Sequence, residues 1–371
     1  MRDLVCFSHL RWAFVLQRPQ HLMARAARNR RVWFVEEPVP GPRPLLRCRV
    51  TPEGVHVCVP EVPAGLGIDG AETVVTGLVA DLARAEGLRG AAAWLYTPMM
   101  LPFAEALDPS LVVYDCMDEL AAFRAAPPEI LYRERALFAR ADLVFVGGPS
   151  LWEAKRGAHA HVHLFRSSVD VSHFRVARSG PPEPATLAPL RRPRLGWVGV
   201  IDERMDLDLL GQVAKLRPDW EWPLIGPVVK IDAGSVPQAP NVHLLGSREY
   251  RELPAYLAHF DVAIMPFARN DATRFISPTK TPEYLAAGLP VVSTAVRDVV
   301  QDYADRGLVH IATDAAGFVA ACERALTERH DPARQHKVDA VLAESSWDDT
   351  WTRMDRLIET AELRTLVRSA K

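Results

Sequence analysis

Lys280 and Glu283 are the two residues whose types and spacing most clearly suggest chemistry. They fall in FISPTKTPEYLAAGLPVVST, residues 275–294, which ends in an apolar β-branched run typical of a buried strand. Pro282 has no N–H and is tolerated only in the first turn of a helix, so it places Glu283 in that turn and Lys280 at or just before it. The start of a helix and a lysine suit a phosphate, and a carboxylate can accept hydrogen bonds from the vicinal hydroxyls of a ribose. A nucleoside diphosphate explains the pair; the alternative is that Glu283 only complements the helix dipole while Lys280 is solvated.

The helix that positions these two charges has recognisable ends. Thr279 or Thr281 is the expected N-cap, because a hydroxyl can accept a hydrogen bond from an N–H group of the first turn. Gly288 and Pro290 are expected to end the helix about two turns later.

A second candidate phosphate contact lies in LGWVGVIDERMDLDLL, residues 195–210. The pattern predicts a strand, a loop and a helix, and the first such turn of a doubly wound unit usually meets phosphate. Gly199 would let backbone approach a ligand closely, and Arg204 could bind a phosphate through two N–H groups. The alternative is a surface arginine paired with Glu203 or Asp206. The chain has neither a G-x-x-x-x-G-K-[ST] nor a G-x-G-x-x-G motif, which disfavours an ATPase or a simple dehydrogenase.

The elements around these residues alternate between short apolar runs and amphipathic stretches, which predicts parallel sheets covered by helices on both faces. We expect an α/β protein with two Rossmann-like, doubly wound domains facing a central crevice, where ligands of such folds bind. The expected parts are an N-terminal domain of residues 1–177, a Pro-rich linker of residues 178–194, a C-terminal nucleotide-binding domain of residues 195–345, and a helix of residues 346–371 that could cross back to the N-terminal domain.

Composition excludes several classes of protein. The chain has 371 residues, of which 49% are hydrophobic and 24% charged, and its net charge of −2 predicts no attraction to nucleic acid or to anionic lipid. Its five cysteines form no C-x-x-C pair and are odd in number, which argues against a disulfide framework and for a reducing compartment. No apolar run reaches the ~18 residues of a membrane span, and no signal peptide is recognisable. These features predict a cytoplasmic protein.

The first half holds further candidates at the ends of two predicted strands. A loop of residues 8–20 mixes aromatic and polar side chains that suit a carbohydrate, and the alternative is a capped loop with its tryptophan in the core. Its candidate acceptor-binding residues are His9, Trp12, Gln17 and Arg18. In VVYDCMDEL, Asp115 and Asp118 follow an apolar strand and could orient a hydroxyl or act as a general base, while helix capping is the alternative for Asp118. Cys116 is expected to be a small buried hydrophobe.

The second half resembles the donor domain of GT-B fold glycosyltransferases, especially the retaining enzymes of family 4. The family pattern P-x-x-x-x-E-Y/A-x-A-x-G-x-P-V-V is matched by PTKTPEYLAAGLPVV, residues 278–292. The resemblance implies that Glu283 holds the donor ribose and that Arg204 and Lys280 act on the diphosphate, with Gly199 beside it. The segment of residues 241–267 is similar to the one that frames the nucleotide base.

One position departs from the family pattern. The family has an earlier glutamate that contacts the donor sugar, and here Phe275 stands eight positions before Glu283. Asp271, Arg274 or Ser277 could substitute for it, or backbone amides could serve alone, and Thr279 is a further candidate donor contact. More narrowly, residues 4–312 resemble bacterial teichuronic-acid-type glycosyltransferases, which share segments like CFSHLRWAFVLQRPQHL, YDCMDE and GWVGVIDERMDLDLL.

The resemblance implies an enzyme that transfers a sugar from a nucleoside-diphosphate sugar to a glycan or lipid-linked saccharide, with no other cofactor. GT-B enzymes generally need no metal, and the D-x-D of Asp206 and Asp208 falls at a predicted helix start, so we expect no metal site. The basic stretch of residues 25–31 could lean on an anionic membrane, although a solvated helix face is the simpler interpretation. A nucleotide-sugar epimerase of the same fold and a non-catalytic sugar-nucleotide-binding protein remain the alternatives.

Overall fold

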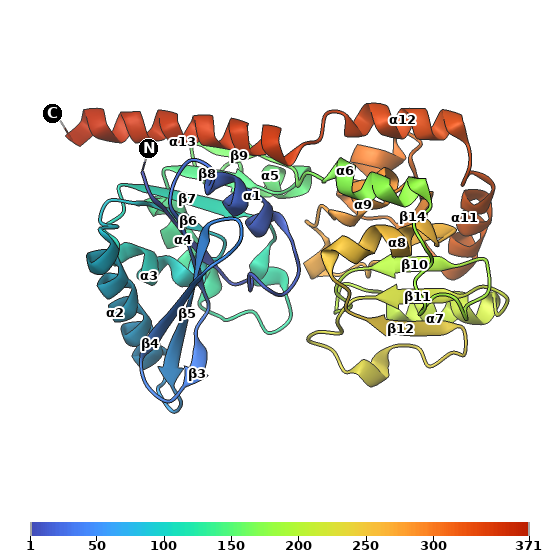
Figure 1. Cartoon of the computed structure of the whole chain (residues 1–371), viewed down its shortest axis with the longest axis horizontal. Helices are drawn as coiled ribbons and strands as arrows, with labels where there is room; N and C mark the ends of the chain where they lie inside the picture. Colours follow the sequence, from blue (N-terminus) through green and yellow to red (C-terminus); the bar gives the residue numbers. More distant parts are fainter. Residues whose placement is uncertain (1, 370–371) are drawn as a thin grey trace. The chain divides into compact units, whose positions relative to one another are not determined.

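The computed structural model describes residues 2–369 and divides the chain into two compact units (Figure 1). Unit 1 comprises Met1–Arg166 and Trp347–Lys371, and unit 2 comprises Ser167–Ser346. Each unit is built on one predominantly parallel sheet with helices packed against it, so the predicted α/β fold with two parallel sheets is confirmed.

The sheet of unit 1 has the strand order β3-β5-β2-β1-β6-β7-β8-β9, and β4 pairs with β5 off this path. Among the described residues, the strands pair in parallel, except that β4 pairs antiparallel with β5. The strands are β1 Leu4–Ser8, β2 Val32–Glu36, β3 Val39–Gly41, β4 Leu45–Val50, β5 Val55–Pro63, β6 Ala92–Leu95, β7 Leu111–Cys116, β8 Leu143–Val146 and β9 Val162–Leu164. The α-helices are α1 Arg18–Ala26, α2 Ile68–Glu86, α3 Leu101–Glu105, α4 Ile130–Arg140, α5 Pro149–Lys155 and α13 Trp347–Ser369.

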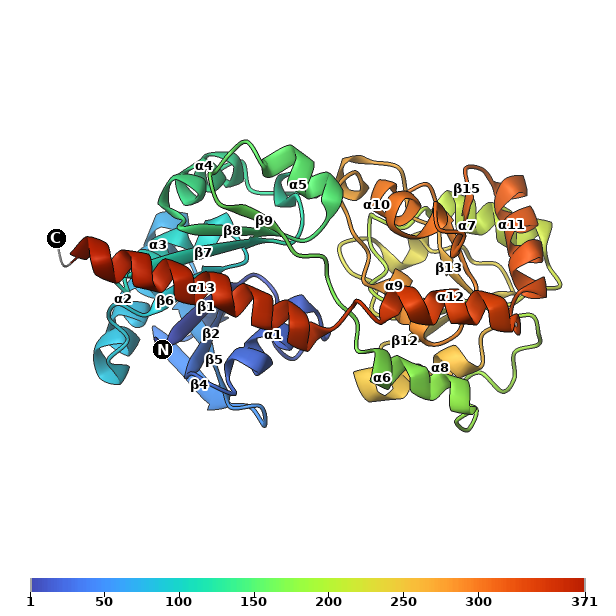
Figure 2. The same cartoon turned by 90° about the horizontal axis from the view of Figure 1, so that it is seen from above.

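Helix α13 belongs to unit 1, although it is the last element of the chain. It lies beside α1 over the sheet (Figure 2), and its Trp351 and Met354 enter the same core as side chains of β1, β2 and β6. Its Asp348 accepts hydrogen bonds from Arg25 at 3.1 Å and from Arg28 at 2.5 Å. Arg30 pairs with Asp355 of the same helix. Three arginines of residues 25–31 thus pair with carboxylates of α13, and the possible contact of this stretch with a membrane stays untested.

The sequence argued against a disulfide framework, and the structure nevertheless contains one disulfide. Strands β4 and β5 form an antiparallel hairpin in which Cys48 lies directly opposite Cys58, and the two are joined by a disulfide. A hairpin can bring two cysteines ten residues apart face to face without any C-x-x-C spacing. Cys116 is buried as predicted, and burial raises the pKa of its thiol well above the ordinary value.

The sheet of unit 2 has the order β12-β11-β10-β13-β14-β15, and neighbouring strands in it pair in parallel. Its strands are β10 Leu195–Val198, β11 Trp222–Ile225, β12 Val242–Gly246, β13 Val262–Met265, β14 Val291–Thr294 and β15 Val309–Ala312. Its α-helices are α6 Val171–Arg175, α7 Leu207–Leu216, α8 Leu253–Ala258, α9 Lys280–Ala286, α10 Arg297–Val299, α11 Ala315–Thr327 and α12 Pro332–Leu342. Because the strands are parallel, the loops that follow them emerge at one edge of the sheet.

The predicted linker of residues 178–194 is not a linker. It lies inside unit 2, whose first residue is Ser167, so the predicted boundary at residue 177 is also misplaced. Leu187 is fully buried in the core of unit 2, and the Thr186 hydroxyl bonds the Tyr256 hydroxyl at 2.9 Å. A Pro-rich segment without regular structure can still pack against a domain when single side chains tether it. Among the described residues, no helix is both long and apolar enough to cross a membrane.

Candidate functional site

Helix α9 begins at Lys280, ends at Ala286 and has Glu283 in its first turn, in agreement with the prediction from Pro282. Gly288 follows with a φ of +88°, a conformation that suits glycine at a helix end. Neither threonine caps the helix as expected. Thr279 occupies the N-cap position without a side-chain cap bond, and Thr281 lies inside the helix with its hydroxyl directed at the sulfur of Met265.

A helix of seven residues is too short to be stable alone, and Tyr284 fixes α9 to the end of β10. The Val198 N–H donates to the Tyr284 hydroxyl at 2.7 Å, and that hydroxyl donates to the Val198 carbonyl at 3.1 Å. The ring is buried, and burial raises the pKa of the phenol, so the hydroxyl keeps its proton and can donate. Tyr284 therefore sets the distance between α9 and the residues that follow β10.

The other end of α9 is held by two arginines from distant segments. Arg178 Nε donates to the Ala286 carbonyl at 2.7 Å, and Arg334 donates to the Leu289 carbonyl just beyond the helix. Arg178 is itself held by Asp339 of α12, at 2.9 and 3.1 Å. Cations at a helix C-terminus satisfy its last carbonyls and complement its dipole.

Lys280 lies directly against Gly199. A Cβ placed on Gly199 would come within 2.1 Å of Lys280 Cε, and the residue has a φ of +140°. Lys280 Nζ is 4.8 Å from the ring centroid of Trp197, and the indole N–H of Trp197 donates to the Gly199 carbonyl at 3.0 Å. Gly199 and Lys280, each predicted to lie beside a diphosphate, are therefore in contact, and Trp197 contacts both.

Gly226, at the end of β11, completes this close packing and was not foreseen. Its φ is +142°, and a Cβ there would lie 1.9 Å from the Gly199 carbonyl oxygen. The signal was present in the sequence, where a glycine directly follows the apolar run WPLI. The two positions without side chains thus let the carboxyl ends of two neighbouring strands and the Lys280 side chain pack closely together.

Arg204 pairs with Asp202, which was not among the partners considered for a surface arginine. Arg204 Nη2 donates to Asp202 Oδ2 at 2.7 Å, and Nε donates to Oδ1 at 3.0 Å. Asp206 caps α7 by accepting from the Leu209 N–H at 2.8 Å, so the D-x-D is helix-start chemistry. No group of three metal-ligating side chains occurs within residues 2–369.

The loop between β13 and α9 is fastened to the Arg204 segment. The Ala268 N–H donates to the Arg204 carbonyl at 2.8 Å, and Asn270 Nδ2 donates to the Glu203 carbonyl at 3.0 Å. Because β10 and β13 are neighbours, the segments carrying Arg204 and Lys280 leave the same edge of the sheet.

The remaining predicted donor residues lie on this loop. Asp271 and Arg274 are exposed, and the Arg274 guanidinium lies 5.1 Å from the ring centroid of Phe275. Ser277 and Thr279 are partly exposed just before α9. Their contacts with a donor sugar stay predictions.

Glu283 has an unusual protonation equilibrium. It is half-buried, and the removal of its carboxyl from water raises its pKa from 4.5 to about 7, while the Lys280 charge opposes the rise. This carboxyl is poorly solvated and titrates near neutral pH. A ligand that donates hydrogen bonds to it would therefore stabilise its ionised form.

Two of the residues predicted to act on substrate in unit 1 are instead a structural pair. Arg18 donates from Nε and Nη2 to the two oxygens of Asp115, both at 2.9 Å, and from Nη1 to the Phe165 carbonyl at 2.7 Å. The side chains of Arg18 and Asp115 are 2% and 0% exposed. The prediction of a catalytic Asp115 and an acceptor-binding Arg18 is corrected accordingly, because neither side chain presents surface to a ligand.

The other unit 1 candidates lie on loops at the strand ends. Gln20 Nε2 donates to the carbonyls of Trp12 and Val15 at 3.1 and 2.9 Å and so shapes the loop before α1. The Trp12 ring packs edge-on against Phe34 at 5.1 Å, as the core alternative expected. The roles of three partly exposed residues stay predictions: His9, Gln17 and Asp118.

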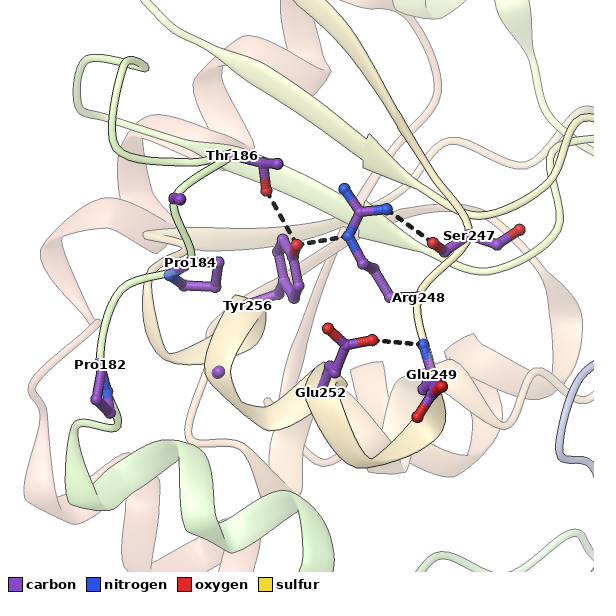
Figure 3. A pocket seen from close by; sticks show the side chains of 10 residues that line it. Pro182, Pro184, Thr186, Ser247, Arg248, Glu249, Glu252 and Tyr256 are labelled. Atoms are coloured by element: carbon purple, nitrogen blue, oxygen red, sulfur yellow. Dashed lines mark hydrogen bonds between the residues drawn. The ribbon is translucent and has the colours of Figure 1, made fainter.

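A hollow of ≈ 600 Å³ opens in unit 2 beside the end of β12 (Figure 3). Arg248 donates to the Tyr256 hydroxyl and to the Ser247 carbonyl, and Glu249 and Glu252 line the same hollow. These residues belong to the segment of residues 241–267 that was predicted to frame the nucleotide base.

Residues 192–328 match the family described as glycosyl transferases group 1. The matched range covers β10 through most of α11, and therefore includes the Gly199–Lys280 contact, the Arg204 segment and α9. The residue types that suggested a phosphate and ribose site thus fall within the range that is similar to group 1 glycosyltransferases.

Among curated proteins, the chain is similar to the teichuronic acid biosynthesis glycosyltransferase TuaH of Bacillus subtilis (strain 168), with 24% identity over 254 residues. The match spans 64% of each chain, so the chain covers less than two thirds of that relative's length.

Among solved structures, sucrose-phosphate synthase from Thermosynechococcus elongatus aligns with a TM-score of 0.72 and 15% identity over 97% of this chain and 99% of that one. Anabaena HepE in complex with UDP and glucose aligns with a TM-score of 0.69 and 12% identity over 97% and 100%. These likenesses confirm the GT-B fold, and with the domain match they confirm the resemblance found in the sequence.

Proposed function

We propose that the chain transfers a sugar from a nucleoside-diphosphate sugar to a glycan or lipid-linked saccharide during cell-surface polysaccharide synthesis. The observation that carries this proposal is the contact between Lys280 and Gly199, with Glu283 one turn further along the same helix. A cation at a side-chain-free strand end suits a diphosphate, and a poorly solvated carboxylate suits the ribose diol. The group 1 domain and the similarity to TuaH support the reaction class and the type of polymer.

In this proposal the chain's main chemical task is to stabilise the leaving group. Lys280 and Arg204 neutralise the charge that develops on the departing diphosphate. Glu283 fixes the nucleoside end, so that the sugar carbon is held in a constant place relative to the two cations. The two cations would make a metal ion unnecessary.

UDP is the first nucleotide to test, because HepE was solved with UDP and glucose and an Escherichia coli relative with a TM-score of 0.67 was solved with UDP-2-fluoro glucose. Thermal-shift screening of UDP, GDP and their sugars should reveal one nucleotide that raises the melting temperature, since a ligand that binds only the folded state stabilises it.

Two variants test the assignment. Glu283→Ala should weaken nucleotide binding, and Arg204→Ala should mainly lower turnover. Nucleotide affinity and turnover both at the wild-type level in these variants would contradict the proposal. The outcome at the anomeric carbon, for which we propose retention, is read from the product by NMR.

We further propose that the reaction takes place in the cytoplasm. The Cys48–Cys58 disulfide would then be reduced in living cells, since a cytosol keeps thiols reduced. Alkylation of free thiols during cell lysis, followed by mass spectrometry, tests this location, and a fully oxidised pair would contradict it.

A further inference from the structure

The ion pair between Asp202 and Arg204 has a geometry that ordinary surface pairs lack. Asp202 is 8% exposed, and its carboxylate receives four hydrogen bonds from Arg204 alone. Oδ1 accepts from the Arg204 backbone N–H and from Nε, both at 3.0 Å, and Oδ2 accepts from Nη2 at 2.7 Å and from Nε at 3.1 Å. The guanidinium is thus gripped along its Nε–Nη2 edge.

This grip stands on a rigid frame. Ile201 is fully buried and bridges to Val228, and Met205 is 5% exposed and bridges to Phe267. The Asp202 carbonyl also accepts from the Met205 N–H at 3.0 Å. The carboxylate therefore has little freedom, so the side chain whose direction the pair determines is that of Arg204.

The pair cannot serve mainly to hold the fold together. Its two members are separated by one residue of the same loop, so the contact joins no distant elements, unlike the Arg18–Asp115 pair across 97 residues. Isolated ion pairs with one partly exposed member add little stability, and the Arg204 side chain is 27% exposed. The same pair does restrict a long, rotamer-rich side chain to one plane.

We propose that Asp202 is a positioning residue that holds Arg204 by its Nε–Nη2 edge and thereby pre-orients the guanidinium for a diphosphate. The proposal rests on the proposed function, in which Arg204 meets the donor's diphosphate. Its distinctive consequence is that removing a negative charge weakens the binding of an anion. Coulomb's law alone predicts the opposite effect on affinity, because removing a carboxylate that repels a diphosphate should strengthen its binding.

A double-mutant cycle with inorganic pyrophosphate and UDP as probes tests this. Dissociation constants are measured by calorimetry for the wild type, Asp202→Asn, Arg204→Ala and the double variant. Asp202→Asn should weaken pyrophosphate binding about tenfold, because the orientation of Arg204 must then be fixed during binding. In the Arg204→Ala background, Asp202→Asn should have no further effect.

Asp208→Asn is the matched control, because it removes the same charge from an exposed position in the first turn of α7. It should leave pyrophosphate binding unchanged or slightly tighter. If Asp202→Asn does not fold, Asp202→Glu keeps the charge but displaces it by one methylene, and it should weaken binding by a smaller factor.

The outcomes separate the two levels of the proposal. Equal or tighter binding in Asp202→Asn, or the same weakening in the Arg204→Ala background, overturns the role of Asp202 while the proposed function stands. If the wild type binds neither probe, or Arg204→Ala binds both as the wild type does, the donor-diphosphate site fails and Asp202 loses its role with it.

Discussion

Replacing Glu283 by glutamine should make the protein more stable at alkaline pH while it weakens nucleotide binding. Burial raises the pKa of this carboxyl to about 7, so the folded protein holds its proton at a pH where the unfolded chain has released it. A raised acid pKa contributes stability that is present at low pH and is lost as the pH rises from about 4.5 through about 7. Glutamine does not ionise, so the variant should not lose stability in this way as the pH rises.

The magnitude follows from the two pKa values. The folded value of about 7 and the ordinary value of 4.5 correspond to an upper bound of roughly 3 kcal/mol at alkaline pH. Glu283 keeps some exposed surface and responds to Lys280, so about 1–2 kcal/mol is the expected difference between pH 5 and pH 8.5. Glutamine keeps the shape, so packing should change little.

Urea unfolding of the wild type and Glu283→Gln at both pH values measures this difference. The variant should gain stability relative to the wild type on going from pH 5 to pH 8.5, and lose affinity for the nucleotide found by screening. Glu344→Gln, at an exposed position of unit 2, is the control and should stay within about 0.5 kcal/mol of the wild type at both pH values. A variant that loses relative stability at pH 8.5 would show that the charged carboxylate is well solvated or well paired, and would refute the reasoning.

Three further changes test how the site is built. Arg178→Ala should lower the free energy of unfolding of unit 2 by about 1–3 kcal/mol in urea, because α9 loses donors at its C-terminal end. The side chain of Arg175 is 52% exposed, so the control Arg175→Ala should stay within about 0.5 kcal/mol of the wild type. Gly226→Ala should lower stability by at least about 3 kcal/mol, since its Cβ would meet the Gly199 carbonyl oxygen at 1.9 Å. The control Gly77→Ala, in open space on α2, should raise stability by about 0.5–1 kcal/mol. Melting curves of the two variants and the wild type measure both effects. Asp115→Ala should cost about 3–5 kcal/mol in denaturant unfolding because it leaves its buried arginine partner unpaired, and a loss below 1 kcal/mol would argue against a structural pair.

Local signals in the sequence predicted the elements that carry the site. Pro282 and Gly288 fix where α9 starts and ends, because the constraints they impose on the backbone do not depend on the rest of the fold. The apolar runs likewise predicted the buried strands on either side. The N-cap could not be predicted in the same way, because Thr281 turns its hydroxyl toward Met265 on a neighbouring strand.

Contacts between distant segments decided what the sequence could not predict. Arg18 and Asp115 have the residue types and strand-end positions of a site, yet they are 97 residues apart and satisfy one another in the core. Residues 178–194 have the composition of a linker, yet Leu187 is buried in unit 2. In each case the local sequence was compatible with two arrangements, and contacts with a segment elsewhere in the chain decide which of them forms.

Glycine shows why a local signal can be visible and still uninformative. Gly199 and Gly226 each follow an apolar strand, and only the first was singled out in the sequence, because it lies in the first strand–helix turn of the second unit. The structure shows that the two are interdependent. Because Gly226 has no side chain, the Gly199 carbonyl can lie against it, and because Gly199 has none, Lys280 can lie against Gly199. A substitution at Gly226 should therefore shift Lys280 without touching it. Loss of pyrophosphate binding in a folded Gly226→Ala variant would demonstrate this chain of contacts, and wild-type binding would show that the two strand ends act separately.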